Sequence, residues 1–230
     1  MCIRDSYFQP RIARAALAVL QHAGWRVRIP RGHVCCGRPL YEFGMLDRAR
    51  DYLAHAIGTI GEHIRNGTPI VCLEPACVST FREDLLKLLP FDAHAKRLSR
   101  QVLLLDELLE REAPDLEWPR LRRDALVHQH CHQKTVLKSD AQSTLLERLG
   151  VDARIPDTGC CGMAGSFGFE AHKYDVSIAC GERVLLPAVR RAPRERLIVA
   201  DGFSCREQIE QTTGRRAMHT AQVLEAALRQ

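Results

Sequence analysis

An internal repeat constrains the fold of this chain more than any other feature of its sequence. The triplet Cys35-Cys36-Gly37 recurs as Cys160-Cys161-Gly162, 125 positions further on in a chain of 230 residues. Other positions repeat at nearly the same offset: Gly24 and Gly150, Ile29-Pro30 and Ile155-Pro156, and Cys77 and Cys205. Self-similarity at one long period indicates a duplicated structural unit. We therefore expect two copies of one unit, the first in residues 1–118 and the second in residues 119–230.

Each half alternates between strand patterns and helix patterns. In the second half, apolar or alternating segments predict strands at 124–130, 151–156 and 196–201. The first half repeats the order, with strands expected at 25–30 and 69–75. Helical spacing of apolar residues predicts helices at 10–23, 45–66, 76–89, 101–112, 135–149, 169–191 and 220–228. This alternation predicts an α/β fold made of two pseudo-repeated, Rossmann-like units with parallel sheets and covering helices.

Four cysteines of the second half follow its predicted strands. Cys131 comes after the first strand, Cys160 and Cys161 after the second, and Cys205 after the third. The carboxyl ends of parallel strands meet at one edge of a sheet, which is the usual ligand edge. We therefore expect the Cys-Cys-Gly loops at the carboxyl ends of the strands, where distant cysteines can meet.

The two halves differ at their beginnings. The second half starts with the strand that delivers Cys131, but a matching strand in the first half would have to precede residue 6 or so. Residues 1–6, MCIRDS, are charged and too few for a buried strand. We therefore interpret the first unit as truncated at its amino end and residues 1–6 as a non-native start.

The paired cysteines favour metal binding over disulfide formation. Neighbouring Cα atoms lie about 3.8 Å apart, below the usual disulfide range of about 4.4–6.8 Å. The chain has ten cysteines but no Cys-x-x-Cys, the spacing common in structural zinc sites. Iron–sulfur clusters accept more varied spacings, and Gly37 and Gly162 leave room for backbone N–H groups around the sulfurs. Buried, inert thiols are the alternative for any single cysteine.

Composition excludes several classes of protein. The formal charge of +5 is mild, and the basic clusters contain no interleaved aromatic residues, so we expect no nucleic-acid partner. No apolar run reaches the roughly 18–20 residues of a membrane span, so none is expected. We expect a cytoplasmic protein, or one held peripherally at the inner membrane.

Five segments carry a resemblance to a known family: CCGRPLYEFGMLDRAR, VCLEPACVSTFRE, VHQHCHQKTVL, GCCGMAGSFGFE and ADGFSCREQI. They resemble the duplicated cysteine-rich (CCG) domain, over residues 7–230. The family includes the heterodisulfide reductase B subunit, the glycolate oxidase iron–sulfur subunit and the anaerobic glycerol-3-phosphate dehydrogenase C subunit. The chain is most similar to the carboxy-terminal part of FAD-linked oxidases of the D-2-hydroxyglutarate and D-lactate dehydrogenase type.

The family's full motif has a leading cysteine, the CCG triplet and a terminal Cys-x-x-Cys, and this chain matches it in part. Gly202 replaces the first cysteine of the terminal pair in the second unit, and Glu74 replaces it in the first. The resemblance implies an iron–sulfur cluster, of the 4Fe–4S type, on the second unit, with the first unit as the weaker site. The matching cysteines are Cys131, Cys160, Cys161 and Cys205 in the second unit, and Cys35, Cys36 and Cys77 in the first.

Histidines flank the leading cysteine of the second unit. His128, His130 and His132 alternate with their neighbours, so a strand would place all three on the face opposite Cys131. A histidine here could hydrogen-bond a cluster sulfur, replace the missing ligand or relay protons, and His130 and His132 are the candidates we single out. The alternative is that they are ordinary polar residues at the end of a strand.

The resemblance implies an iron–sulfur electron-transfer module of an FAD-linked 2-hydroxyacid oxidoreductase. FAD would lie on a domain or subunit upstream, and electrons would pass to a quinone or another redox protein. The chain alone would not be active, and no catalytic residue is assigned within it. Two alternatives stay open: a cluster-based disulfide or thiol reductase subunit like heterodisulfide reductase B, and a non-catalytic docking domain that binds zinc or no metal.

Overall fold

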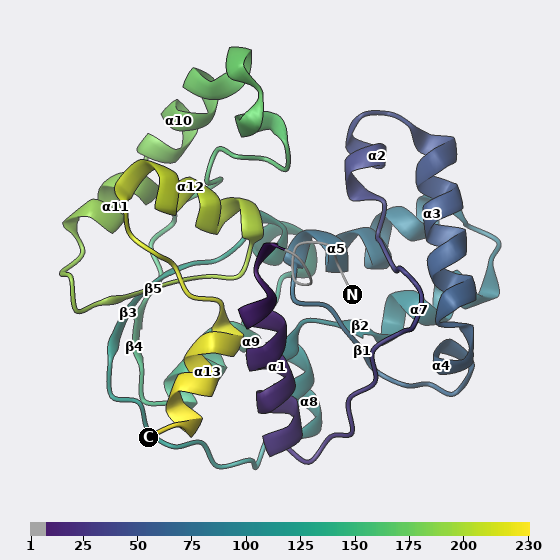
Figure 1. Ribbon diagram of the computed structural model, residues 1–230, viewed down its shortest axis with the longest axis horizontal. Helices are drawn as coiled ribbons and strands as arrows, with labels where there is room; N and C mark the ends of the chain where they lie inside the picture. Colours follow the sequence, from purple (N-terminus) through teal and green to yellow (C-terminus); the bar gives the residue numbers. More distant parts are fainter. Residues whose placement is uncertain (1–7) are drawn as a thin grey trace. The chain divides into compact units, whose positions relative to one another are not determined.

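The computed structural model describes residues 8–230, so the predicted non-native start at 1–6 lies outside the described residues. The chain forms two compact units (Figure 1), Met1–Pro114 (unit 1) and Asp115–Gln230 (unit 2). Each unit contains helices around a small parallel sheet, which confirms the predicted α/β fold. None of the helices within residues 8–230 has both the length and the apolar character that a membrane crossing requires.

Unit 1 has a two-stranded parallel sheet, in which Ile70 lies opposite Val102 and Val71 opposite Leu103. Helices α3, α4 and α7 pack together beside this sheet (Figure 1). A π-helical turn at Thr80–Asp84 joins α5 to α6. The elements are α1 (Pro10–His22), α2 (Arg38–Glu42), α3 (Leu46–Thr59), α4 (Gly61–Arg65), β1 (Ile70–Val71), α5 (Pro75–Ser79), α6 (Leu85–Leu88), α7 (Ala93–Gln101), β2 (Val102–Leu103) and α8 (Leu105–Glu112).

Unit 2 has a three-stranded parallel sheet in the order β4-β3-β5, with β3 in the centre. Helices α11 and α12 cover one face of the sheet and α9 and α13 the other (Figure 1). Short helical turns at Gln133–Leu137, Phe167–Phe169 and Ala171–Lys173 connect the longer elements. These are β3 (Asp124–His128), α9 (Ala141–Arg148), β4 (Asp152–Arg154), α10 (Tyr174–Glu182), α11 (Leu185–Arg191), β5 (Leu197–Ala200), α12 (Phe203–Thr213) and α13 (Thr220–Leu228).

The core of unit 2 explains why β3 and β5 form where their sequences are most apolar. Leu126 and Ile198 come from adjacent strands and pack with Met163 in one buried cluster. Cys161 and Cys205 belong to the same cluster, at 4% and 2% exposure. The sheet therefore holds both cysteines in a dry environment at its carboxyl edge.

The prediction of a strand at residues 25–30 is wrong, although the helix before it ends where predicted. The segment follows α1 where Gly24, at φ +87°, ends the helix, as the glycine predicted. However, residues 25–30 pair with no strand among the described residues. A strand requires a neighbour for its N–H and C=O groups, and the neighbour predicted for this one would precede residue 6.

Several predicted helices also differ from the structure, and those expected at 45–66 and 76–89 are divided into α3 and α4 and into α5 and α6. The helix expected at 135–149 begins only at Ala141, because Lys138 takes a left-handed conformation at φ +51°. The helix expected at 169–191 is divided into α10 and α11 after two short turns. The helix expected at 101–112 begins at Leu105, because β2 pairs with β1.

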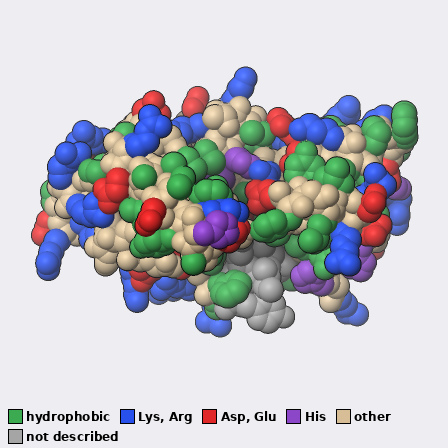
Figure 2. Space-filling view, turned by 90° about the horizontal axis from the view of Figure 1, so that it is seen from above, with side chains coloured by type: hydrophobic (Ala, Val, Ile, Leu, Met, Phe, Trp, Pro, Cys, Tyr) green, Lys and Arg blue, Asp and Glu red, His purple; other side chains and the backbone are tan. Residues whose placement is uncertain are grey.

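Charges are dispersed on the face of the molecule that Figure 2 shows. Lys and Arg side chains lie among Asp and Glu side chains on this face (Figure 2). Ion pairs on the surface of unit 2 include Arg190 with Glu182 at 2.7 Å and Arg216 with Glu210 at 2.9 Å. Among the described residues on this face, positive charge is not concentrated in one patch.

Candidate metal centre

Four cysteines of unit 2 meet at the carboxyl edge of its sheet. Cys131 lies three residues after the end of β3, and Cys205 is in the first turn of α12, directly after β5. Cys160 and Cys161 are in the loop that follows β4. Residues that follow neighbouring parallel strands converge at this edge. The interactions among the thiols of these four cysteines agree with that convergence.

The four thiols perturb one another's pKa in succession. Thiol hydrogen bonds from Cys131 and then from Cys161 lower the pKa of Cys160, and the N–H of Gly162 lowers it further. The same bond to Cys160, followed by burial, raises the pKa of Cys131. The order of interactions among the thiols is therefore Cys131, Cys160, Cys161, Cys205.

Cys205 is the second thiol that favours its charged form. A thiol hydrogen bond from Cys161 is the largest cause that lowers the pKa of Cys205, and His128 and His130 lower it electrostatically. Donation to Cys160 and Cys205, together with burial, raises the pKa of Cys161. The site therefore presents thiolate character at two sulfurs, and thiolate is the form that binds metal.

Gly162 fits the loop closely around these sulfurs. Its φ is +95°, and a Cβ built on it would overlap the carbonyl oxygen of Ser177 on α10. Its N–H donates to Sγ of Cys160 over 3.3 Å. A glycine at this position lets the loop pack against α10 while its amide faces a sulfur.

His128 is the histidine that the structure places among the sulfurs. Three possible ligand atoms lie within 4.8 Å of one another: a ring nitrogen of His128 and the sulfurs of Cys161 and Cys205. All three residues are buried. Nδ1 of His128 lies 2.6 Å from Oγ1 of Thr158, and Nε2 has no hydrogen-bond partner within residues 8–230. A buried, unpartnered nitrogen beside two thiols is a metal-ligand geometry.

His130 occupies space beside Cys205. A Cβ built on Gly202 would overlap the imidazole of His130 and lie 3.0 Å from Sγ of Cys205. Gly202 is the position where the family motif has a cysteine, so here an imidazole fills the volume that a cysteine side chain would need. Nδ1 of His130 accepts a hydrogen bond from the N–H of His132 over 3.2 Å, which fixes the orientation of the ring.

His130 and His132 are the histidines predicted from the sequence as candidates, whereas His128 is the one that the structure places among the sulfurs. His132 is half-buried, and its ring meets that of His130 edge to face at 5.2 Å between centroids. His128 is the last residue of β3, and the alternation of the three histidines does not show where that strand ends.

Unit 1 repeats part of this geometry. Sγ of Cys36 lies 3.2 Å from Sγ of Cys77, and the N–H of Gly37 donates to Sγ of Cys35 over 3.5 Å. Glu74 is buried at 2% exposure. Within residues 8–230, the group of three possible ligand atoms lies in unit 2, whereas unit 1 brings the sulfurs of Cys36 and Cys77 together.

Comparison with known proteins decides the family. Residues 2–82 and 125–210 match the CCG family, described as a cysteine-rich domain. The chain belongs to the CCG cysteine-rich domain family. The two matches confirm the resemblance drawn from the sequence, and the second match contains the four converging cysteines of unit 2.

Curated relatives of this CCG chain include dehydrogenases and their subunits. The anaerobic glycerol-3-phosphate dehydrogenase C subunit of Escherichia coli is 28% identical over 97% of the chain, which spans 57% of that protein. D-2-hydroxyglutarate dehydrogenase of Pseudomonas putida is 26% identical over 95% of the chain, which spans 21% of that enzyme. Lactate utilization protein A of Anoxybacillus flavithermus is 27% identical, with 80% of each chain covered.

Proposed function

We propose that this CCG chain is an iron–sulfur electron-transfer module of an FAD-linked 2-hydroxyacid oxidoreductase. The observation that carries the proposal is the convergence of the thiols of Cys131, Cys160, Cys161 and Cys205 at one sheet edge. Two of the relatives are named for 2-hydroxyglutarate and lactate, both of which are 2-hydroxyacids. The FAD domain and the substrate pocket would lie outside this chain. The electron acceptor would be a quinone or a redox protein. The assembly would be cytoplasmic or peripheral at the inner membrane.

The donor set fits a 4Fe–4S cluster. Such a cluster takes four cysteine thiolates as its standard ligands, and this site offers four thiols that interact one after the next. A cluster bound there would supply one-electron transfer. Burial of Cys161 and Cys205 would exclude water, and the N–H of Gly162 at the sulfur of Cys160 would stabilise negative charge on it. These two effects act in opposite directions on the reduction potential.

Anaerobic reconstitution with iron and sulfide tests the proposal. We expect about four irons and four sulfides per chain and an electron paramagnetic resonance signal after reduction. Cys161→Ser should lose the cluster absorbance. Cys180→Ser is the matched control, because Cys180 is half-buried on α10 and is not among the converging thiols, so this variant should keep the cluster. Loss of iron in both variants, or zinc as the sole metal in the native chain, would contradict the proposal.

A single metal ion such as zinc is the second candidate, and the position of His128 favours it. Three ligand atoms, from His128, Cys161 and Cys205, lie within 4.8 Å of one another, and zinc accepts two cysteines and one histidine with an open fourth position. His128→Ala separates the candidates. A zinc site would lose its metal in this variant, whereas a cluster held by four cysteines would keep its four irons.

A further inference from the structure

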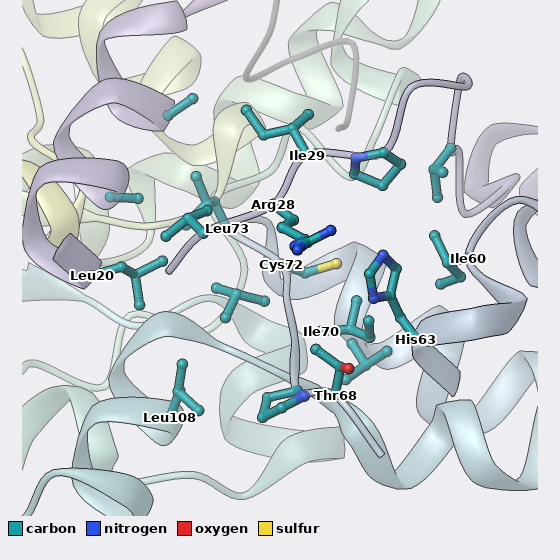
Figure 3. Close-up of a pocket in the computed structure, with 18 of the residues that line it drawn as sticks. Leu20, Arg28, Ile29, Ile60, His63, Thr68, Ile70, Cys72, Leu73 and Leu108 are labelled. Carbon is teal, nitrogen blue, oxygen red and sulfur yellow. The ribbon is translucent and has the colours of Figure 1, made fainter. Parts of the chain in front are cut away.

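Unit 1 contains a cavity of about 800 Å³ that is lined by residues of unit 1. Figure 3 shows Leu20 of α1, Ile29 of the extended segment and Ile70 of β1 around it. The lining is mainly apolar and extends to Cys36 and Cys77 at the CCG loop. The cavity therefore runs along the length of β1, between this strand and residues 25–30.

The internal repeat shows what fills the corresponding place in unit 2. Residues 25–30 correspond to the segment that contains β4, because Ile29-Pro30 matches Ile155-Pro156. Likewise β1 corresponds to β5, because Cys77 and Cys205 follow these strands at matching positions. In unit 2 the strand between β4 and β5 is β3. The cavity of unit 1 thus lies where a counterpart of β3 would lie.

On both sides of the cavity, peptide groups of Val71 and of residues 26–30 have no backbone partner within residues 8–230. The N–H of Cys72 donates to the carbonyl of Leu103 over 2.9 Å, toward β2. Peptide groups alternate in direction along a strand, so those of Val71 point away from β2, to the side that the cavity occupies. Across the cavity, residues 26–30 make no backbone hydrogen bond within the described part of the chain.

Burial shows that β1 is an edge strand and β5 is not. Both residues of β1 are only half-buried. Their counterparts Ile198 and Val199 in β5 are 2% and 0% exposed, because β3 lies on one side and Met218 bridges the other. The corresponding positions of β1 and β5 therefore differ in burial because β1 has no neighbouring strand, among the described residues, where β5 has β3.

The size of the cavity also matches one strand. A strand in a packed sheet takes about 4.8 Å laterally and about 10 Å between layers, so about 800 Å³ corresponds to a length of about 17 Å. Five residues in extended conformation, at about 3.3 Å each, span that length. β3 has five residues, of which the last four are buried.

We propose that the cavity of unit 1 binds an extended, apolar polypeptide strand of the β3 type, supplied from outside residues 8–230 and not by a second copy of this chain. The strand would run parallel to β1 and pair with both β1 and residues 26–30. This would produce the strand order that unit 2 has. A central strand in a parallel sheet is apolar on both faces, so the occupant has several consecutive apolar residues and no proline. This inference does not depend on the proposed electron transfer.

A peptide that copies residues 123–130 of the chain is the probe. Trp25 lines the cavity and Trp118 is the only other tryptophan, so in Trp118→Phe the emission of Trp25 reports on the cavity. We expect saturable binding with one peptide per chain and a shift of the Trp25 emission to shorter wavelength. Hydrogen exchange of the Val71 amide should slow by at least about tenfold.

The matched control peptide carries Leu126→Pro and Val127→Pro, which remove two N–H donors and keep the apolar character. It should bind at least about tenfold more weakly, because it cannot complete the ladder. Equal binding of the two peptides would overturn the proposal. So would failure of the first peptide to bind when dodecanoate shifts the Trp25 emission, since the cavity would then be a small-molecule site. Protection of the Val71 amide that depends on chain concentration, without peptide, would also overturn the proposal, because a second copy of the chain would then be the occupant.

Discussion

Replacement of Gly162 by alanine should destabilise unit 2 through two separate effects. A residue other than glycine at a positive φ such as +95° costs about 1–2 kcal/mol. The new Cβ would also overlap the carbonyl oxygen of Ser177, which is held in place by a 3.2 Å hydrogen bond from Nε2 of Gln208. Forcing packed backbone apart costs about 1–3 kcal/mol more. We therefore expect Gly162→Ala to lower the free energy of unfolding by about 2–5 kcal/mol.

Gly159→Ala is the matched control in the same loop. Gly159 also has a positive φ, +60°, but a Cβ there would meet nothing within 4 Å. Only the conformational effect applies, so we expect a loss of about 1–2 kcal/mol. Urea unfolding of both variants, followed by circular dichroism and with the slope compared to that of the native chain, gives the two values. Equal losses would refute the argument that the contact with Ser177 determines this position.

Three further predictions follow from other contacts. Gly202→Cys, which restores the family motif, should destabilise the chain because the new side chain overlaps His130. Adding His130→Ala to this variant should recover part of the lost unfolding free energy, as measured in a double-mutant cycle. Cys160 is exposed and its pKa is lowered, so mass spectrometry should find that its alkylation rate in the metal-free chain stays nearly constant between pH 8 and pH 6, where free cysteine slows by about a hundredfold. Asp201→Ala should lower the free energy of unfolding by about 2–4 kcal/mol in urea or thermal unfolding, because the buried carboxylate accepts hydrogen bonds from the N–H and hydroxyl of Thr220 over 2.7 and 2.8 Å. Asp201→Asn should lower the free energy of unfolding by less.

The repeat and the apolar strands could be predicted from the sequence because the evidence for them is local. β3 and β5 lie within the predicted segments 124–130 and 196–201, where three and four apolar residues, respectively, run together. Hydrophobic burial alone stabilises such a segment as a central strand. The same reasoning failed at residues 25–30, because a half-apolar segment becomes a strand only when a neighbour supplies its hydrogen bonds.

The candidate site could be predicted in its sulfurs but not in its nitrogens. The Cys-Cys-Gly triplets mark the loops by composition, and strand order then brings Cys131 and Cys205 toward them. Which histidine joins them depends on where β3 ends, and the strand ends at His128. The exclusion of a side chain at Gly202 by His130 likewise arises from tertiary packing, which no spacing in the sequence encodes.

The contact between Cys36 and Cys77 makes unit 1 sensitive to oxidants. The two sulfurs lie 3.2 Å apart although 41 positions separate them in the chain. Oxidation by air would draw them to about 2.05 Å and close a covalent loop between the CCG turn and α5. The entropy lost by the unfolded chain would stabilise unit 1 by about 4 kcal/mol. Preparations handled with and without reductant would then be two chemical species with different melting temperatures, and only the reduced one would offer both thiols to a metal.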